Sequence, residues 1–235
     1  AQGGIRVKKR YLRNMKTLSE EDMNKLSRSR VCVVGCGGLG GYIIEMLARI
    51  GVGYITAIDG DVFDETNLNR QLLSNTKNVG LSKAYEAKKR VEIVNPDVII
   101  NPIAVMIDST NASTLLKGHD IVVDALDNIN SRRLIQKYSS EFKIPMVHGA
   151  IAGFFGQVTT IFPEDNTLDL LYSGDANLNK GVEKELGNPS FTPALVASIE
   201  VAEVIKVLLH KGKPLRKKVL FIDLLNNNFD VLDFF

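Results

Sequence analysis

The residues of this chain whose types and spacing most clearly indicate a chemical function are four glycines and two cations. The glycines directly follow the apolar run Val31 to Val34: Gly35, Gly37, Gly38 and Gly40. A tight turn needs residues that tolerate positive φ, and backbone N–H groups approach a phosphate closely only where no Cβ intervenes. Arg70 and Lys83 follow, thirteen positions apart. A strand that ends in a glycine turn, with cations downstream, predicts a bound nucleotide.

Two carboxylates stand where strands are predicted to end. Asp59 closes the predicted strand Tyr54 to Asp59, the place from which an acid reaches the ribose hydroxyls in Rossmann-type folds. A turn or capping aspartate is the alternative there. Asp127 follows the predicted strand Ile121 to Asp124 and could hold Mg²⁺ through oxygen. The alternative at this position is a helix N-cap at Asp127 or Asn128.

The two cations favour a triphosphate over a dinucleotide. A nicotinamide cofactor needs only its pyrophosphate neutralised, whereas a triphosphate carries about four charges and requires several Lys, Arg or metal contacts. Arg70 lies in the polar segment Asp64 to Gln71, and Lys83 opens a predicted helix. Each cation alone could be a solvated surface residue, so the prediction depends on their meeting at one place.

Alternating strands and helices must position these residues. A capped helix is predicted over Thr17 to Leu26. The strands expected after it are Val31 to Val34, Tyr54 to Asp59, Val98 to Pro102, Ile121 to Asp124 and Pro145 to His148. The helices expected among them are Gly41 to Ile50, Ser82 to Val94 and Ser131 to Phe142. This alternation predicts an α/β fold with a Rossmann-like, doubly wound, mainly parallel sheet.

The pattern changes after Gly156. Three further strands lack crossover helices and are therefore expected to pair antiparallel: Gln157 to Phe162, Lys218 to Ile222 and Phe229 to Phe234. The polar segment Pro163 to Pro189 is longer than an ordinary connection, which predicts a functional or disordered loop. Thr192 as N-cap and Pro193 at the first position predict a helix that runs to His210.

The whole chain is expected to form one domain. Its parts are an N-terminal arm and helix (1–28), a nucleotide-binding part (29–155) and a part with antiparallel strands, a crossover loop and a C-terminal helix (156–235). The net charge of +2 is too small for a dedicated nucleic-acid binder. Cys32 and Cys36 cannot form a disulfide framework, and neither a membrane span nor a signal peptide is visible. A soluble, cytoplasmic protein is expected.

The motifs taken together resemble a known family. GCGGLG, IDGD, NLNRQ, GLSK, DALDN and HGAIAGFFGQVTTIFP occur in the order and spacing of the ThiF/MoeB/HesA family, the bacterial relatives of ubiquitin-activating enzymes. The resemblance extends from Arg10 to the C-terminus. It implies an ATP-dependent adenylyltransferase that activates the C-terminal glycine of a small ubiquitin-like sulfur-carrier protein, ending in Gly-Gly, and releases pyrophosphate.

The resemblance also implies roles for the matching positions. The phosphates of ATP are expected to contact Gly35, Gly37, Gly38, Gly40, Asn67, Arg70 and Lys83. Asp59 is expected on the ribose and Asp127 on Mg²⁺. In the family an arginine near the N-terminus reaches the ATP of the opposite subunit, and the segment Arg10 to Arg13 matches that motif. Arg13 is therefore the candidate, and a homodimer is the expected assembly.

The cysteines depart from the family pattern. Many members carry two Cys-x-x-Cys pairs for zinc and a further cysteine in the crossover loop. This chain has neither, and Cys36 lies in the phosphate turn. ATP and Mg²⁺ are expected without zinc, and the reaction is expected to stop at the acyl-adenylate.

Other functions remain open at this point. The same scaffold serves a tRNA threonylcarbamoyladenosine dehydratase, which activates a carboxylate carried on RNA; the GQVTTIF segment and the modest charge favour the protein-activating branch. A NAD-dependent oxidoreductase would have no use for the pair Arg70 and Lys83, and an inactive member would not need it. A carboxylate substrate is already ionised at neutral pH, so no general base is required, and His119 and His148 are expected to be structural.

Overall fold

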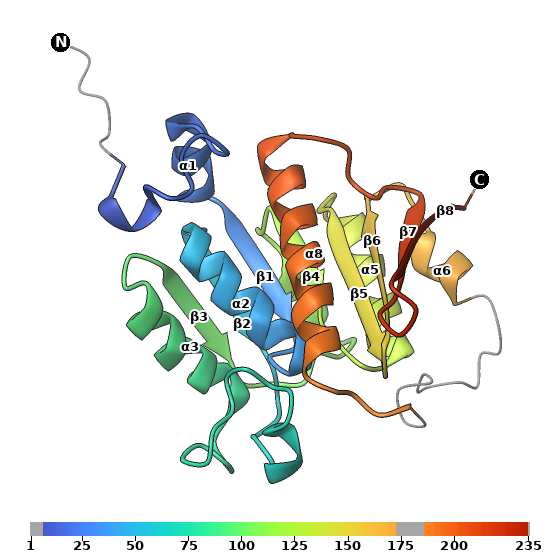
Figure 1. Ribbon diagram of the computed structural model, residues 1–235, viewed down its shortest axis with the longest axis horizontal. Helices are drawn as coiled ribbons and strands as arrows, with labels where there is room; N and C mark the ends of the chain where they lie inside the picture. The colour runs from blue at the N-terminus through green and yellow to red at the C-terminus, as the bar shows by residue number, and fades with distance from the viewer. Residues whose placement is uncertain (1–6, 173–185, 235) are drawn as a thin grey trace.

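The computed structural model describes residues 7–172 and 186–234, which form a single sheet covered by helices on both faces (Figure 1). The sheet has eight strands in the order β3-β2-β1-β4-β5-β6-β7-β8. Their bounds are β1 Arg30–Val34, β2 Tyr54–Ile58, β3 Ile99–Ile103, β4 Ile121–Asp124, β5 Met146–Ala152, β6 Phe155–Ile161, β7 Lys218–Asp223 and β8 Asn228–Asp233.

The helices divide between the two faces. One face is covered by α1 (Glu20–Leu26), α2 (Gly38–Ile50), α3 (Lys83–Val94) and α8 (Phe191–Leu209), whose apolar residues share one core. The other is covered by α4 (Ala112–Leu116), α5 (Ile129–Glu141) and α6 (Thr167–Leu171), which pack on a second core. Two short 3-10 helices complete the described elements, η1 (Lys9–Tyr11) and η2 (Glu65–Asn67).

Strand direction changes at β5. The five strands from β3 to β5 pair in parallel, and β6, β7 and β8 continue the sheet in antiparallel pairs. The predicted fold class, a mainly parallel Rossmann-like sheet extended by antiparallel strands, is confirmed. Parallel strands place their carboxyl ends at one edge of the sheet, which is where ligands bind in this architecture. The turns after β1, β2 and β4 therefore meet at that edge.

Some element boundaries differ from the prediction. Helix α2 begins at Gly38 rather than Gly41, so two of the motif glycines lie in its first turn. Helix α8 begins at Phe191, after Ser190, and Thr192 is not its N-cap. The Thr192 hydroxyl instead donates to the Gly153 carbonyl, at 2.6 Å. The Thr-Pro pattern predicts a capping role for this side chain, but the side chain makes a tertiary hydrogen bond instead.

The long polar segment after β6 is only partly described. It contains α6, which the sequence did not predict, and residues 173–185 of this segment lie outside the described residues. None of the helices in the described ranges combines the length and the apolar character needed to cross a lipid bilayer.

The N-terminal arm packs against the C-terminal end of α2. A Cβ on Gly51, the C-cap of α2, would lie 2.8 Å from the Tyr11 ring, and the Asn14 amide donates to the Ile50 carbonyl at 3.3 Å. Between them, Arg13 is exposed. The glycine turn is at the other end of this thirteen-residue helix, about 20 Å away. The arm and the glycine turn of one chain are therefore separated by the length of α2.

Candidate active site

A cleft of about 200 Å³ opens at the carboxyl ends of β1, β2 and β4. It brings together seven of the predicted site residues: Gly35, Gly37, Gly38, Asp59, Arg70, Lys83 and Asp127. The residues come from the turns after three strands, from the segment around η2 and from the start of α3. The convergence that the sequence analysis required of the two cations is therefore present.

Two of the glycines are required by the fold itself. Gly35 has φ of +100°, and a Cβ there would lie 2.6 Å from the Ala125 carbonyl oxygen. A Cβ on Gly40 would lie only 1.7 Å from the Gly35 carbonyl oxygen. The turn is thus packed between its own helix and the segment after β4. Gly40 supports the turn and does not line the cleft.

The other two glycines face the cleft and have room beside them. A Cβ on Gly37 would have the Gln71 amide nitrogen as its nearest neighbour, at 3.4 Å, and a Cβ on Gly38 would be 3.8 Å from Pro193. Both are ordinary contacts, so close packing within the protein does not explain these glycines. Both glycines line the cleft at the start of α2, and the N-terminus of a helix is a place where phosphate groups commonly bind.

This difference leads to a prediction about paired variants. Gly40→Ala is expected to lower the melting temperature because its Cβ overlaps backbone. Gly37→Ala is expected to keep the melting temperature and to lose at least tenfold in ATP affinity. Thermal unfolding and calorimetric titration with ATP check both. A Gly37→Ala variant that binds ATP as the wild type does would show that this glycine makes no close approach to the ligand.

Asp59 supports the glycine turn as well as lining the cleft. Its carboxylate accepts hydrogen bonds from the backbone N–H of Cys36, at 2.7 Å, and of Asp61, at 2.8 Å. Burial raises the pKa of Asp59, against the lowering effect of these two bonds and of Lys83. Burial also raises the pKa of the Cys36 thiol well above its usual value, and the Asp59 carboxylate adds to that shift. Cys36 is therefore an inert thiol in this state.

The two predicted cations are held differently. The Lys83 side chain is only 9% exposed, and its ammonium lies 3.2 Å from an Asp61 carboxylate oxygen. Arg70 is half-buried and donates to the Thr66 carbonyl and to the Asn69 amide oxygen, at 3.0 and 2.9 Å. Both side chains have charged groups at the cleft wall.

Two polar groups of the cleft lack partners among the described residues. Gln71 and Asn188 both line the cleft, and their side-chain oxygens are buried and accept no hydrogen bond from the described residues. Buried polar atoms are almost always paired, so an orphan in a cleft indicates a ligand or water position. The consecutive residues Val105, Met106 and Ile107 also line the cleft and add apolar surface to it. A cleft lined by both polar and apolar side chains suits a nucleotide with its base.

Two predicted site residues do not line the cleft, in addition to Gly40. Asn67 closes a capping box on η2, in which its side-chain oxygen accepts from the Asp64 N–H at 3.0 Å. Arg13 lies at the far end of α2, as described above. Their predicted contacts with phosphate stay predictions.

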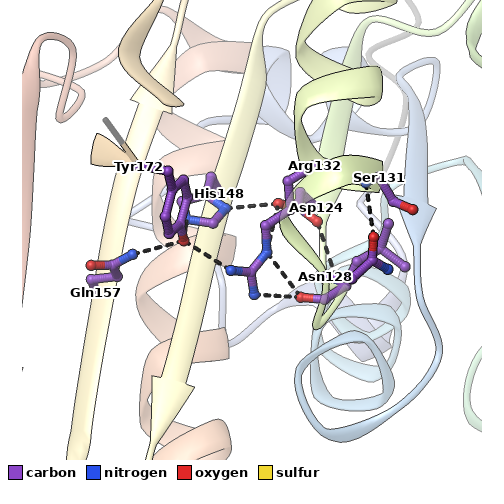
Figure 2. Close-up of polar contacts among 8 residues, drawn as sticks. Asp124, Asn128, Ser131, Arg132, His148, Gln157 and Tyr172 are labelled. Carbon is purple, nitrogen blue, oxygen red and sulfur yellow. Dashed lines mark hydrogen bonds and ion pairs between the residues drawn. The ribbon is translucent and has the colours of Figure 1, made fainter. Parts of the chain in front are cut away.

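Asp127 occupies an exposed position in the cleft wall between two restrained neighbours. Asn128, not Asp127, caps α5, by accepting from the Ser131 N–H at 2.8 Å. On the other side, the Leu126 N–H donates to Asp124 at 3.0 Å, and the Leu126 carbonyl accepts two hydrogen bonds from the Arg132 guanidinium, at 3.2 and 2.6 Å (Figure 2). Of the two residues considered as the N-cap of this helix, Asn128 therefore has that role and Asp127 does not.

A buried polar cluster lies behind this turn (Figure 2). His148 is fully buried, with one ring nitrogen 2.7 Å from an Asp124 carboxylate oxygen and the other 3.0 Å from the Tyr172 hydroxyl. Burial lowers the pKa of His148, so the ring is neutral at pH 7. It then donates to Asp124 and accepts from Tyr172. His148 does not line the cleft, and neither does His119, which bonds Thr56 and the Leu116 carbonyl.

Comparison with known proteins decides the family. The model of the ThiF family matches residues 11–234. The chain belongs to the ThiF family. The SAMP-activating enzyme E1 of Haloferax volcanii is 35% identical over 228 residues, which cover 96% of this chain and 84% of that protein. The sulfur carrier protein adenylyltransferase of Thermus thermophilus is 34% identical over 238 residues, with 94% and 84% covered.

Two further matches are a second kind of enzyme that resembles part of the chain and a solved structure that shares its fold. The tRNA threonylcarbamoyladenosine dehydratase of Haemophilus influenzae is 36% identical over 138 residues, 58% of this chain and 52% of that protein. A crystal structure of E. coli MccB with ATP superposes with a TM-score of 0.82 at 22% identity, covering 97% of this chain and 72% of that one, and shows the shared fold. The predictions of the family and of the enzyme class, an ATP-dependent adenylyltransferase, are confirmed.

This ThiF-family chain has a second cavity beside the nucleotide cleft. It measures about 340 Å³, is mostly apolar and shares two residues with the cleft, Ile151 and Arg132. Its other walls include Phe155, Phe221 and Tyr172, from β6, from β7 and from the end of α6. Arg132, Tyr172 and this cavity were not predicted from the sequence. No local pattern marks them, since they depend on how β5, β6, β7 and α6 pack together.

Proposed function

We propose that this protein adenylates the C-terminal glycine carboxylate of a small ubiquitin-like sulfur-carrier protein. One observation carries the proposal: the cleft in which the open glycines Gly37 and Gly38, the cations Arg70 and Lys83, and the carboxylate Asp127 meet. The relatives named for sulfur carrier proteins support the choice of substrate class. Such a substrate brings its own nucleophile, so the site has only to bind, orient and neutralise charge.

In the proposed reaction, the carboxylate of the carrier attacks the α-phosphorus of ATP. The α-phosphorus–pyrophosphate bond breaks as the acyl–phosphate bond forms, and pyrophosphate leaves in line. Arg70 and Lys83 offset the charge that develops on the leaving group, as do the N–H groups at the start of α2. Asp59 holds the ribose. We also assign Asn67 to the phosphates, although its side-chain oxygen accepts from the Asp64 N–H in this structure.

Asp127 is the residue we assign to Mg²⁺. Carboxylate oxygen is the donor that this ion prefers, and one or two carboxylates suffice when phosphate oxygens complete the shell. Asp127 supplies such a carboxylate, and it is exposed in the same cleft as the two cations proposed to contact the phosphates. When bound, the ion would neutralise charge on the phosphates. The protein's part is to keep the carboxylate at a fixed place.

The apolar cavity gives the carrier a route to the cleft. Because it shares Ile151 and Arg132 with the nucleotide cleft, an extended Gly-Gly tail that occupies it ends beside the phosphates. A tail of glycines has no side chains, so it fits a narrow channel, and the only polar groups it buries are those of its backbone. The aromatic walls Phe155 and Phe221 would contact the residues that precede the tail.

The direct test is exchange of labelled pyrophosphate into ATP, with and without candidate proteins that end in Gly-Gly. Exchange that depends on both the carrier and its terminal glycine is the expected result. Binding of ATP together with no exchange, for every such carrier, would contradict the proposal.

We further propose a homodimer in which Arg13 serves the cleft of the partner subunit. The position of the arm supports this, since Arg13 and the glycine turn of the same chain lie at opposite ends of α2. Each mixed dimer of an Arg13→Ala and a Lys83→Ala subunit has one intact site of its two, so mixed dimers are expected to recover up to about one half of wild-type exchange, or about one quarter in a random mixture of the two subunits. Dimers shown to be mixed by mass spectrometry, with no recovery, would remove this role.

A tRNA dehydratase is the second candidate, favoured by the 36% identity to that relative. The same cleft would then activate a carboxylate attached to RNA. Incubation with ATP and tRNA that carries threonylcarbamoyladenosine separates the two functions. Loss of one water from the nucleoside, seen by mass spectrometry, would favour the dehydratase, whereas an unchanged nucleoside favours the carrier.

A further inference from the structure

Arg132 connects the two cavities through its hydrogen bonds. Its side chain is 7% exposed and lines both the nucleotide cleft and the apolar cavity. Two of its nitrogens donate to the Leu126 carbonyl, next to Asp127, and the third donates to the Tyr172 hydroxyl at 2.8 Å (Figure 2). The guanidinium is planar and rigid, so its three nitrogens cannot move independently. A shift at the Tyr172 end is transmitted to the turn that carries Asp127.

The Tyr172 hydroxyl is fixed from three elements at once. It donates to the neutral His148 ring on β5, and it accepts from Arg132 on α5 and from the Gln157 amide on β6, at 3.0 Å. One donor and two acceptor positions are therefore filled, which is the full capacity of a hydroxyl. The Tyr172 ring itself forms part of the apolar cavity wall. Its orientation is thus set by the cluster and not by solvent.

Asp124 completes the restraint from the opposite side. Its two oxygens bond the His148 ring and the Leu126 N–H, and the second of these bonds fixes the same residue whose carbonyl Arg132 holds. The Leu126 backbone is therefore hydrogen-bonded at its N–H by Asp124 and at its carbonyl by Arg132. Asp127, the next residue, is the first whose side chain is free of this cluster and lies in the cleft.

We propose that Arg132 and Tyr172 are positioning residues for the metal-binding carboxylate Asp127, and that they tie its place to the wall of the apolar cavity. This inference rests on the proposed function, since it takes Asp127 as the Mg²⁺ ligand. Outer-shell partners of metal ligands commonly contribute ten- to a hundredfold to metal affinity. Here the cluster does not bond the Asp127 carboxylate but holds the backbone N–H and carbonyl of Leu126, the residue directly before it.

The test measures how much Mg²⁺ improves ATP binding, without any carrier protein. ATP is titrated into the full-length protein by calorimetry, once with Mg²⁺ and once with EDTA, and the ratio of the two dissociation constants is the metal-dependent gain. Tyr172→Phe removes only the hydroxyl, Arg132→Lys keeps the charge but loses the fork, and Asp127→Asn is the reference. Tyr138→Phe is the matched control, because that hydroxyl bonds the Ser109 carbonyl outside both cavities.

Tyr172→Phe and Arg132→Lys are expected to lose about tenfold of the metal-dependent gain and to keep metal-free ATP binding, which also shows that they are folded. Tyr138→Phe should behave as the wild type. Variants that keep the full gain while Asp127→Asn loses it would overturn the inference. If Asp127→Asn also keeps the gain, the metal assignment fails and the inference falls with it, whereas adenylation itself is judged separately by pyrophosphate exchange.

Discussion

Replacing Lys83 with alanine is expected to raise the barrier to adenylation by about 2 to 4 kcal/mol, or roughly 30- to 1,000-fold in rate. Lys83 is nearly buried at the cleft wall, where low solvent exposure strengthens its field on the departing pyrophosphate. Its loss also leaves the Asp61 carboxylate without this ion pair, which adds repulsion toward phosphate. Pyrophosphate–ATP exchange at saturating ATP measures the effect.

Lys88→Ala provides the matched control for this variant. Lys88 lies on the same helix, α3, but it is more exposed and does not line the cleft. Exposed ion pairs such as that of Lys88 with Glu92 contribute little, so this variant should exchange at the wild-type rate. An exchange rate within threefold of wild type for Lys83→Ala would exclude Lys83 from the charge-neutralising role.

Replacing Glu200 with glutamine is expected to stabilise the protein, and more so as the pH rises. Glu200 lies in the middle of α8 and is fully buried, and among the described residues neither of its carboxylate oxygens has a hydrogen-bond partner. Burial raises its pKa well above the usual 4.5, the Asp124 carboxylate adds to the shift, and Arg132 opposes it. The carboxyl group is therefore held in its neutral form in the folded protein.

The sign of the pH dependence follows from which state holds the proton. Below the usual pKa both states are protonated, and Glu200 contributes no pH dependence. Above it the unfolded chain releases the proton while the folded chain retains it, so the free energy of unfolding falls as pH rises toward the folded pKa. Each unit of the shift corresponds to about 1.4 kcal/mol. Glutamine removes this loss because it does not titrate.

Chemical denaturation at pH 5 and pH 8 measures the difference. The stabilisation by Glu200→Gln should be larger at pH 8 than at pH 5. Glu92→Gln, an exposed substitution on α3, should differ little between the two pH values. Equal effects of Glu200→Gln at both pH values would mean that the buried carboxyl does not hold its proton in the folded state.

Local geometry explains which parts of the site could be predicted. The turn at Gly35 and Gly40 is visible in the sequence because sterics dictate the residue type at each position. Arg70 and Lys83 were placed together by their spacing and by the family resemblance, and the structure brings them to one cleft. Asn67 shows the limit of that approach, since a polar side chain beside a short helix is also a capping residue.

The missed residues depend on contacts between distant segments. Tyr172 meets His148, Gln157 and Arg132 only once four elements have packed, and nothing around it in the sequence marks that outcome. Thr192 was misassigned for the same reason, because it lies in the first turn of α8 and its hydroxyl donates to the Gly153 carbonyl instead of capping the helix. Sequence patterns describe neighbours along the chain, whereas this cluster consists of neighbours across the sheet.

The glycine turn is packed into place only after a distant part of the chain has been synthesised. β1 pairs with β4, so that Val31 lies beside Ile121, and the Ala125 N–H donates to the Val34 carbonyl at 2.9 Å. Gly35 packs against that same Ala125. A nascent chain that has the whole glycine motif but has not yet emerged through β4 thus lacks one wall of the cleft. Completion of the cleft therefore depends on this long-range pairing, a slow kind of folding step.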